Sequence, residues 1–139
     1  MNPRIGVIAI SALTLLWACA TNYAPLVTGP GASPGATTHN AEGMTHYQMG
    51  HWDVAKGHFE AAVKAEPDRA VPHYNLGLAL HRLGSHSEAT AHFKKAGELA
   101  PNNPAITGSH VYRHHVRSGG HGDAHADCCG LRSGPSYGH

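Results

Sequence analysis

The sequence predicts an all-α protein, a short solenoid of helix-turn-helix units with a signal segment before it and disordered ends. Two observations carry this prediction: an internal repeat of 34 residues and an apolar N-terminal segment that stops at Cys19. A third observation concerns function, because the 139 residues include 14 histidines but only three cysteines. Ten Lys and Arg residues balance nine Asp and Glu residues without any basic run, which argues against nucleic acid as a partner.

The internal repeat is visible when the sequence is shifted against itself by 34 residues. Chance alone would give about two identities in such a window. The shift aligns nine identical pairs: Ala36 with Ala70, His39 with His73, Gly43 with Gly77, Gly50 with Gly84, Ala55 with Ala89, His58 with His92, Phe59 with Phe93, Ala62 with Ala96, and Pro67 with Pro101.

The second copy resembles the tetratricopeptide repeat, a helix-turn-helix unit of 34 residues. The positions that carry the resemblance are His73, Leu76, Gly77, Leu80, Ala89, Phe93 and Pro101. The first copy is weaker, because Glu42 stands where the pattern has Leu and His46 where it has a large apolar residue. The resemblance covers two units, 36–69 and 70–103, and implies a protein-binding scaffold rather than an enzyme.

We expect the two repeats to occupy residues 38–103, with helices at 38–49, 52–65, 71–83 and 86–99. Small residues allow the two helices of each unit to approach closely; they are Gly43, Gly77, Ala55 and Ala89. The two recurring phenylalanines, Phe59 and Phe93, are expected to fill the space between units.

Local signals predict where the helices start and turn. Gly50 and Gly84 fall at the expected turns, where a residue that tolerates positive φ is useful. Ser85 with Glu88 three residues later predicts a capping box. Asn103 followed by proline predicts the start of a further helix.

That further helix is expected over residues 104–117 as a cap on the solenoid. Ala105, Tyr112 and Val116 would share one face and cover the apolar side of the second unit. A cap is needed because two repeats are fewer than solenoids generally require to be stable alone. Another protein could serve the same purpose.

The resemblance also implies a partner-binding groove, because the first helix of each unit lines such a groove in this family. By repeat position, the groove residues are Asn40, Met44, Tyr47, Gln48, Tyr74, Leu78, His81 and Arg82. The alternative is that Met44, Tyr74 and Leu78 pack against the fifth helix or against a second copy of the chain, which would be a homo-oligomer.

Residues 1–18 predict a signal peptide, since one basic residue precedes an apolar run that is too short for a comfortable membrane span. The run ends in LWAC, residues 16–19, which resembles the lipobox of bacterial lipoproteins except at Trp17. The resemblance implies that Cys19 is acylated. The lipid would anchor the chain to a membrane, and the protein would face the periplasm. The outer membrane is favoured because Ala20 is not Asp. A secretory signal and an uncleaved anchor are the alternatives, and each also implies export.

The regions that flank the repeats are rich in small residues. Residues 19–37 contain Gly, Pro, Ala, Ser and Thr in quantity and no charge, which predicts a flexible linker. Residues 118–139 are rich in Gly and His and predict a disordered tail.

The histidines divide into two groups. Four of those in the repeats recur in register and are expected to be packing or surface residues; they are His39, His58, His73 and His92. The C-terminal group offers ligands suited to zinc, nickel or copper: His110, His114, His121, His125, Cys128 and Cys129. Their spacing matches no firm metal motif, so a solvated tail is the simpler interpretation, and no cofactor is otherwise expected. The adjacent cysteines could form a vicinal disulfide, link two chains or stay reduced on a metal.

Taken together, the sequence predicts an exported, lipid-anchored adaptor that binds a partner protein at the cell envelope. The rival hypothesis is a periplasmic metal-binding or metal-handling protein that acts through its C-terminal tail.

Overall fold

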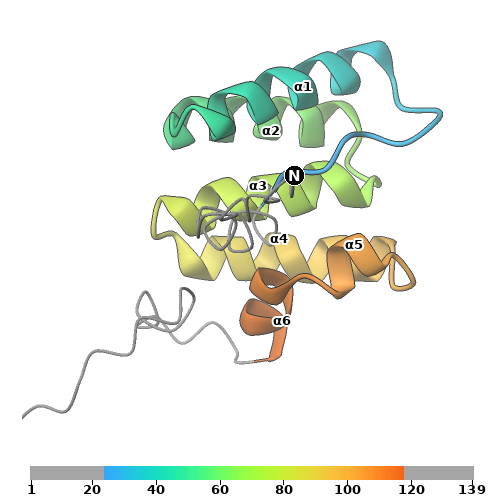
Figure 1. Cartoon of the computed structure of the whole chain (residues 1–139). Coiled ribbons are helices and arrows are strands. Elements are labelled where there is room, and N and C mark those ends of the chain that lie inside the picture. The colour runs from blue at the N-terminus through green and yellow to red at the C-terminus, as the bar shows by residue number, and fades with distance from the viewer. Residues whose placement is uncertain (1–23, 118–139) are drawn as a thin grey trace, which may run out of the picture.

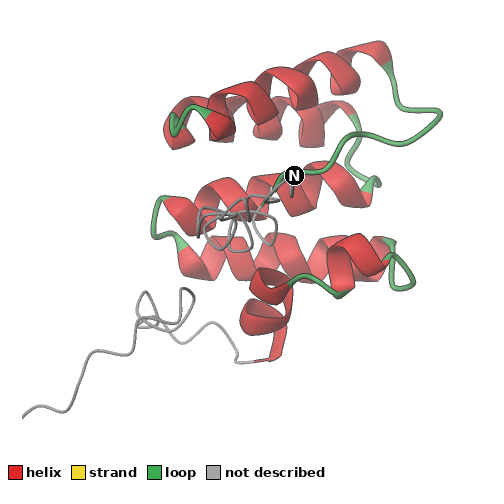
Figure 2. Ribbon diagram, in the orientation of Figure 1, coloured by secondary structure: helices red, strands yellow, loops and turns green. Residues whose placement is uncertain are grey.

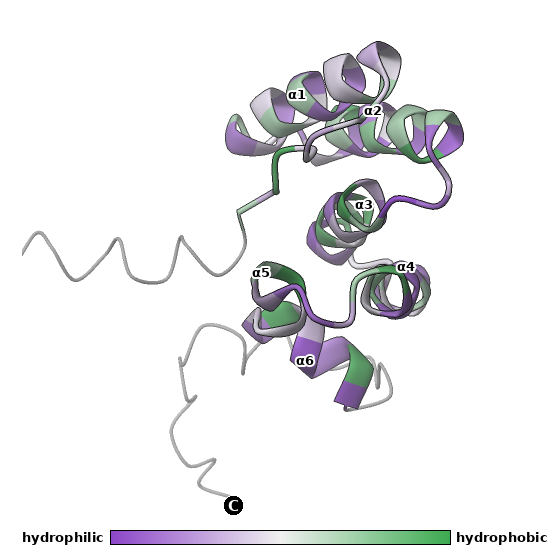
Figure 3. Ribbon diagram, turned by 90° about the vertical axis from the view of Figure 1, so that its right-hand side faces the viewer, coloured by the Kyte–Doolittle hydropathy of each residue, from purple (hydrophilic) through white to green (hydrophobic). Residues whose placement is uncertain are grey.

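The computed structural model describes residues 24–117, which contain six helices and no strand (Figure 1). The helices are α1 (Pro34–Gln48), α2 (Trp52–Ala65), α3 (Ala70–Arg82), α4 (His86–Leu99), α5 (Pro104–Thr107) and α6 (His110–Arg117). They stack as three layers, α1 with α2, α3 with α4, and α5 with α6. Seen from the side, α1, α3 and α5 line one face of the stack and α2 and α4 the other (Figure 3).

The all-α prediction is confirmed, and two helices match their expected bounds. The first helix begins at Pro34, four residues earlier than expected. Ser33 explains the earlier start, because its Oγ accepts a hydrogen bond from the Ala36 N–H while proline occupies the first helical position.

Two glycines permit the close approach of the helices within each unit. A Cβ added at Gly43 would lie 2.6 Å from Cε1 of Phe59, and one at Gly77 would lie 2.8 Å from Cε1 of Phe93. Each phenylalanine therefore packs on the glycine of its own unit. Phe93 also contacts the next layer, as expected, since its ring centre lies 6.4 Å from that of Tyr112 and 5.1 Å from that of His115. Both rings are fully buried.

The turns inside the units contain glycines at positive φ, as predicted. Gly50 has φ of 80° and Gly84 has φ of 81°. The predicted capping box at Ser85 is wrong, because the Ser85 side chain accepts no capping hydrogen bond. Its ψ of 62° lies outside the extended region that capping residues usually adopt.

The segment expected as one capping helix over 104–117 forms two short helices. Asn103 begins α5, with its Oδ1 accepting from the Ala105 N–H at 3.0 Å. The helical conformation is interrupted at Gly108. Ser109 then caps α6, because its Oγ accepts a hydrogen bond from the Tyr112 N–H at 3.2 Å. The segment therefore has two helix starts, one capped by Asn103 and one by Ser109, which explains why it forms two helices.

The two short helices do cover the second unit. Ile106 and Val111 are fully buried in the common core, and Tyr112 lies directly over Gly97 of α4. Ala105, expected on the covering face, is exposed instead, and the neighbouring Ile106 is buried in its place.

Candidate functional site

The predicted groove is largely covered in the structure. Five of its eight residues are at most 7% exposed: Asn40, Tyr47, Tyr74, Leu78 and His81. Met44 is half-buried, and only Gln48 and Arg82 are exposed. The assignment of an open groove along the whole face is therefore wrong.

Part of the cover is the chain's own N-terminal segment, held by two asparagines. Asn75 accepts a hydrogen bond from the Leu26 N–H at 2.7 Å and donates one to the Leu26 carbonyl at 2.7 Å. Asn40 donates to the same carbonyl at 2.9 Å and accepts from Asn75 Nδ2 at 2.7 Å. We call this arrangement the asparagine clamp. It binds main-chain groups alone, so it selects an extended backbone rather than a particular side chain.

Further contacts fix the rest of this segment. The Arg69 guanidinium donates to the Pro30 carbonyl at 3.2 Å, and the Ser33 N–H donates to a Glu66 carboxylate oxygen. A flexible linker over 19–37 is therefore wrong for residues 24–37. The prediction failed because composition does not show the backbone hydrogen bonds of Leu26, nor that Pro25 is buried and Leu26 packs against the core.

The cap covers the other part of the face. A cleft of about 270 Å³ lies between the N-terminal segment, Tyr74 and the α5–α6 connection, with Leu26, Gly108 and Ser109 in its lining. Burial raises the pKa of Tyr74, which a hydrogen bond with Ser109 partly offsets. The alternative that Tyr74 packs against the segment expected as the fifth helix is the one the structure supports.

The opposite end of the face stays open around Arg82. Arg82 Nε donates to the Tyr47 hydroxyl at 3.1 Å, and its Cζ lies 5.2 Å from the centre of the Trp52 ring. Tyr47 packs edge-on against the same tryptophan, with ring centres 4.7 Å apart. Burial raises the pKa of Tyr47, so its hydroxyl stays protonated and accepts through oxygen.

Large apolar side chains are exposed beside this arginine. Met49 is 62% exposed and Leu83 is 42% exposed, and they occupy equivalent positions one repeat apart. Both end the first helix of their unit, and the two turns lie at the same end of the molecule (Figure 2). We call the surface formed by Met49, Trp52, Arg82 and Leu83 the turn edge.

Comparison with family models gives a match to the tetratricopeptide repeat over residues 40–104. Residues 40–104, a little under half of the chain, therefore form tetratricopeptide repeats. Comparison with curated proteins and with solved structures gave no match. Tetratricopeptide repeats are protein-interaction modules and are typically non-catalytic scaffolds.

The recurring histidines of the tetratricopeptide repeats are part of the packing between the helices of a unit. In the second repeat, Nδ1 of His73 lies 3.0 Å from Nδ1 of His92, and Nε2 of His73 lies 2.9 Å from the Pro67 carbonyl. Burial lowers the pKa of His92, His73 lowers it further, and Glu88 and Glu60 oppose both.

In the first repeat, the two equivalent histidines are bridged by the carboxylate of Glu42 instead of contacting each other through their ring nitrogens. Glu42 lies 3.1 Å from Nδ1 of His58 and 3.5 Å from Nδ1 of His39, on a half-exposed surface. The leucine that stands at the equivalent place in the second repeat is Leu76, which is buried. The departure of Glu42 from the family pattern thus creates a polar bridge between the helices.

Of the six predicted metal ligands, two lie in the described part of the chain. His110 and His114 share a face of α6 as expected, with stacked rings whose centres are 6.4 Å apart. The other four, His121, His125, Cys128 and Cys129, lie outside the described residues.

A different set of histidines meets beside the cap of the tetratricopeptide repeats. His81 on α3, His86 at the start of α4 and His115 on α6 each present a ring nitrogen within 4.8 Å of the others. Sequence analysis placed His81 in the groove and gave His115 no role. Two signals were available: His81 and His115 are 34 residues apart, which is the repeat period, and His81 and His86 lie on either side of a glycine turn.

None of the helices over residues 24–117 combines the length and apolarity needed to cross a membrane. Cys19, the predicted lipidation site, lies outside that range.

Proposed function

We propose that this tetratricopeptide repeat protein is an adaptor of the bacterial cell envelope and binds its partner protein at the turn edge. The observation that carries the proposal is the pair Met49 and Leu83, which expose apolar side chains at equivalent positions of both repeats. Apolar side chains exposed together on one surface often mark an interaction site.

The turn edge also has the composition of a binding surface. Trp, Met and Arg are enriched at protein interfaces, and Trp and Arg are frequent among the residues that dominate binding energy. Arg82 is held over Trp52 and tied to the Tyr47 hydroxyl, so less side-chain entropy is lost when a partner binds. A fitting partner segment has apolar side chains for Met49 and Leu83 and a carboxylate or carbonyl for Arg82.

The covered half of the face is a poorer binding surface. A competing segment would have to displace residues 24–30 from the asparagine clamp, whose hydrogen bonds are made within one chain. An intramolecular segment acts at a high effective concentration, which a separate partner must overcome. The partner is therefore expected to bind while the N-terminal segment stays in place.

Photo-crosslinking from defined positions tests this surface. The full chain is expressed in its source bacterium with p-benzoylphenylalanine at position 49 or 83, or at the exposed control positions Lys64 and Lys95 on α2 and α4. Both edge positions should give the same protein adduct and the controls should not. Arg82→Ala should then weaken binding of that protein more than about fivefold, as loss of an important interface residue does. Equal adducts from all four positions would refute the assignment of the turn edge as the binding surface.

Lipid attachment at Cys19 is the second part of the proposal, and it rests on the lipobox. Leu26 is held on the repeats seven residues later, and seven residues reach at most about 25 Å. A lipidated Cys19 would therefore keep the repeats close to the membrane surface. Metabolic labelling with a palmitate analogue tests the attachment. Cys19→Ser should remove both the label and the membrane association, and a labelled Cys19→Ser chain would contradict it.

A further inference from the structure

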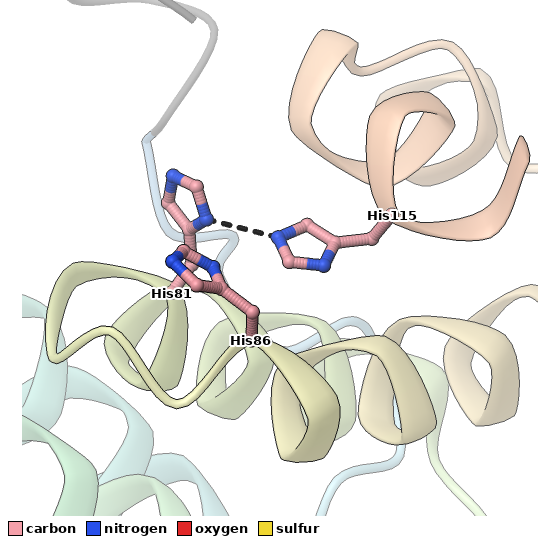
Figure 4. A group of neighbouring side chains, drawn as sticks. All are labelled: His81, His86 and His115. Carbon is pink, nitrogen blue, oxygen red and sulfur yellow. Dashed lines mark hydrogen bonds between the residues drawn. The ribbon is translucent and has the colours of Figure 1, made fainter. Parts of the chain in front are cut away.

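We propose that His81, His86 and His115 bind one zinc-class divalent metal ion, which ties the α5–α6 cap to the second repeat. The three residues come from three different helices (Figure 4). His115, on α6, is the one farthest from the other two in sequence. One ring nitrogen of each lies within 4.8 Å of the others. Imidazole nitrogens suit zinc, copper and nickel, and three protein ligands with an open fourth position form a common zinc arrangement.

The protonation state of His115 is fixed by Thr90. The Thr90 hydroxyl donates its one hydrogen to the His86 carbonyl at 2.8 Å. Its oxygen lies 2.8 Å from Nδ1 of His115, so it must accept a hydrogen bond from that nitrogen. Neutral His115 therefore carries its lone pair on Nε2. A second residue that orients a histidine in this way is the usual support of a metal ligand.

That lone pair points at His81. Nε2 of His115 lies 2.9 Å from Nδ1 of His81, which donates a hydrogen bond to it (Figure 4). When a metal binds, the hydrogen of neutral His81 moves to its other ring nitrogen, so both facing nitrogens become ligands without net release of a proton. Zinc–nitrogen bonds of about 2.0–2.1 Å at the tetrahedral angle require a separation of about 3.3–3.4 Å. The two rings must part by only about 0.4 Å.

The burial of the cluster favours neutral ligands. His81 is 7% exposed and His115 is 1% exposed, whereas His86 is half-buried and gives access from solvent. Burial first, then His86 and His114, lower the pKa of His115 to about 4. His115 is therefore available as a neutral ligand at physiological pH.

A metal at this site would strengthen the weakest layer of the stack. The cap consists of one four-residue helix and one eight-residue helix, too short to be stable alone. An ion shared by α3, α4 and α6 would stabilise the capped form over any form in which α6 is detached. This role is separate from the turn edge, so either proposal can fail without the other.

Zinc titration of the metal-free full chain tests the site. The parent for all measurements carries His110→Gln, His121→Gln, His125→Gln, Cys128→Ser and Cys129→Ser, so that neither the His110–His114 pair nor the predicted ligands beyond residue 117 contribute. Calorimetry should show one zinc ion bound per chain, and zinc should raise the melting temperature.

Matched variants assign the binding to the cluster. His86→Gln changes a half-exposed residue, so its helicity by circular dichroism should be unchanged while zinc affinity falls at least about 100-fold. Thr90→Val should lower zinc affinity about tenfold through the orientation of His115. The control combines His39→Gln with His58→Gln, which disrupts the second group of three potential ligands that lie close together in the described residues. It should bind zinc like the parent. A parent that binds no zinc, a His86→Gln variant that binds within threefold of the parent, or a loss that follows the control variant would each overturn the proposal.

Discussion

Replacing Asn75 by Ala should release the N-terminal segment from the repeats. The Asn75 side chain is fully buried and makes three hydrogen bonds of 2.7 Å: two with Leu26 and one with Asn40. The substitution leaves the Leu26 N–H and the Asn40 Oδ1 without partners, at about 1–3 kcal/mol for each buried group. Because the segment can move into water instead, we expect the free energy of unfolding to fall by about 2–4 kcal/mol.

Two measurements check this expectation. Urea denaturation gives the loss of stability, and amide hydrogen exchange gives the local effect, since Asn75 is what protects the Leu26 N–H. Asn102→Ala is the control, because Asn102 is exposed and its replacement should change stability by less than about 0.5 kcal/mol. An Asn75→Ala protein that keeps both its stability and the protection of Leu26 would refute the asparagine clamp.

Three further predictions follow from packing and charge. Gly77→Ala should destabilise the protein by about 1–2 kcal/mol, because its Cβ would overlap the ring of Phe93. Gly57→Ala has open space around it and should stabilise the protein by about 0.5–1 kcal/mol. Thermal denaturation should therefore show a lower melting temperature for the first variant and a higher one for the second. Tyr74→Ala combined with Leu78→Ala should unfold the protein by circular dichroism, since both are core residues, and a folded double variant would restore their assignment to a groove. His92 has a lowered pKa, so the unfolded chain binds more protons below pH 6.5 and stability falls there. His92→Gln should flatten this fall between pH 7 and pH 5, and equal slopes would contradict the cause.

The sequence predicted the repeats well because their signals are local and periodic. Gly50, Gly84 and Asn103 each determine a turn or a cap through their own backbone or side chain. The 34-residue shift then placed the helices, since both units obey the same packing rule.

The contacts that close the groove were beyond such reasoning. Asn40 and Asn75 are 35 residues apart, one residue out of register with the repeat, so the alignment did not pair them. The partner of the clamp is a backbone group of Leu26, which leaves no trace in residue type. His115 lies 34 residues after His81, in register with the repeat, but the sequence did not show that α6 brings its ring to within 2.9 Å of the His81 ring.

Hydrogen exchange of the full chain, alone and saturated with the protein found by crosslinking, decides whether the partner binds at the turn edge. We expect new protection at residues 48–54 and 82–84, where the turn edge lies, with the Leu26 amide as protected as before. A complex in which Leu26 loses protection and the turn edge stays unchanged would contradict this expectation, because the partner would then occupy the place of the chain's own N-terminal segment.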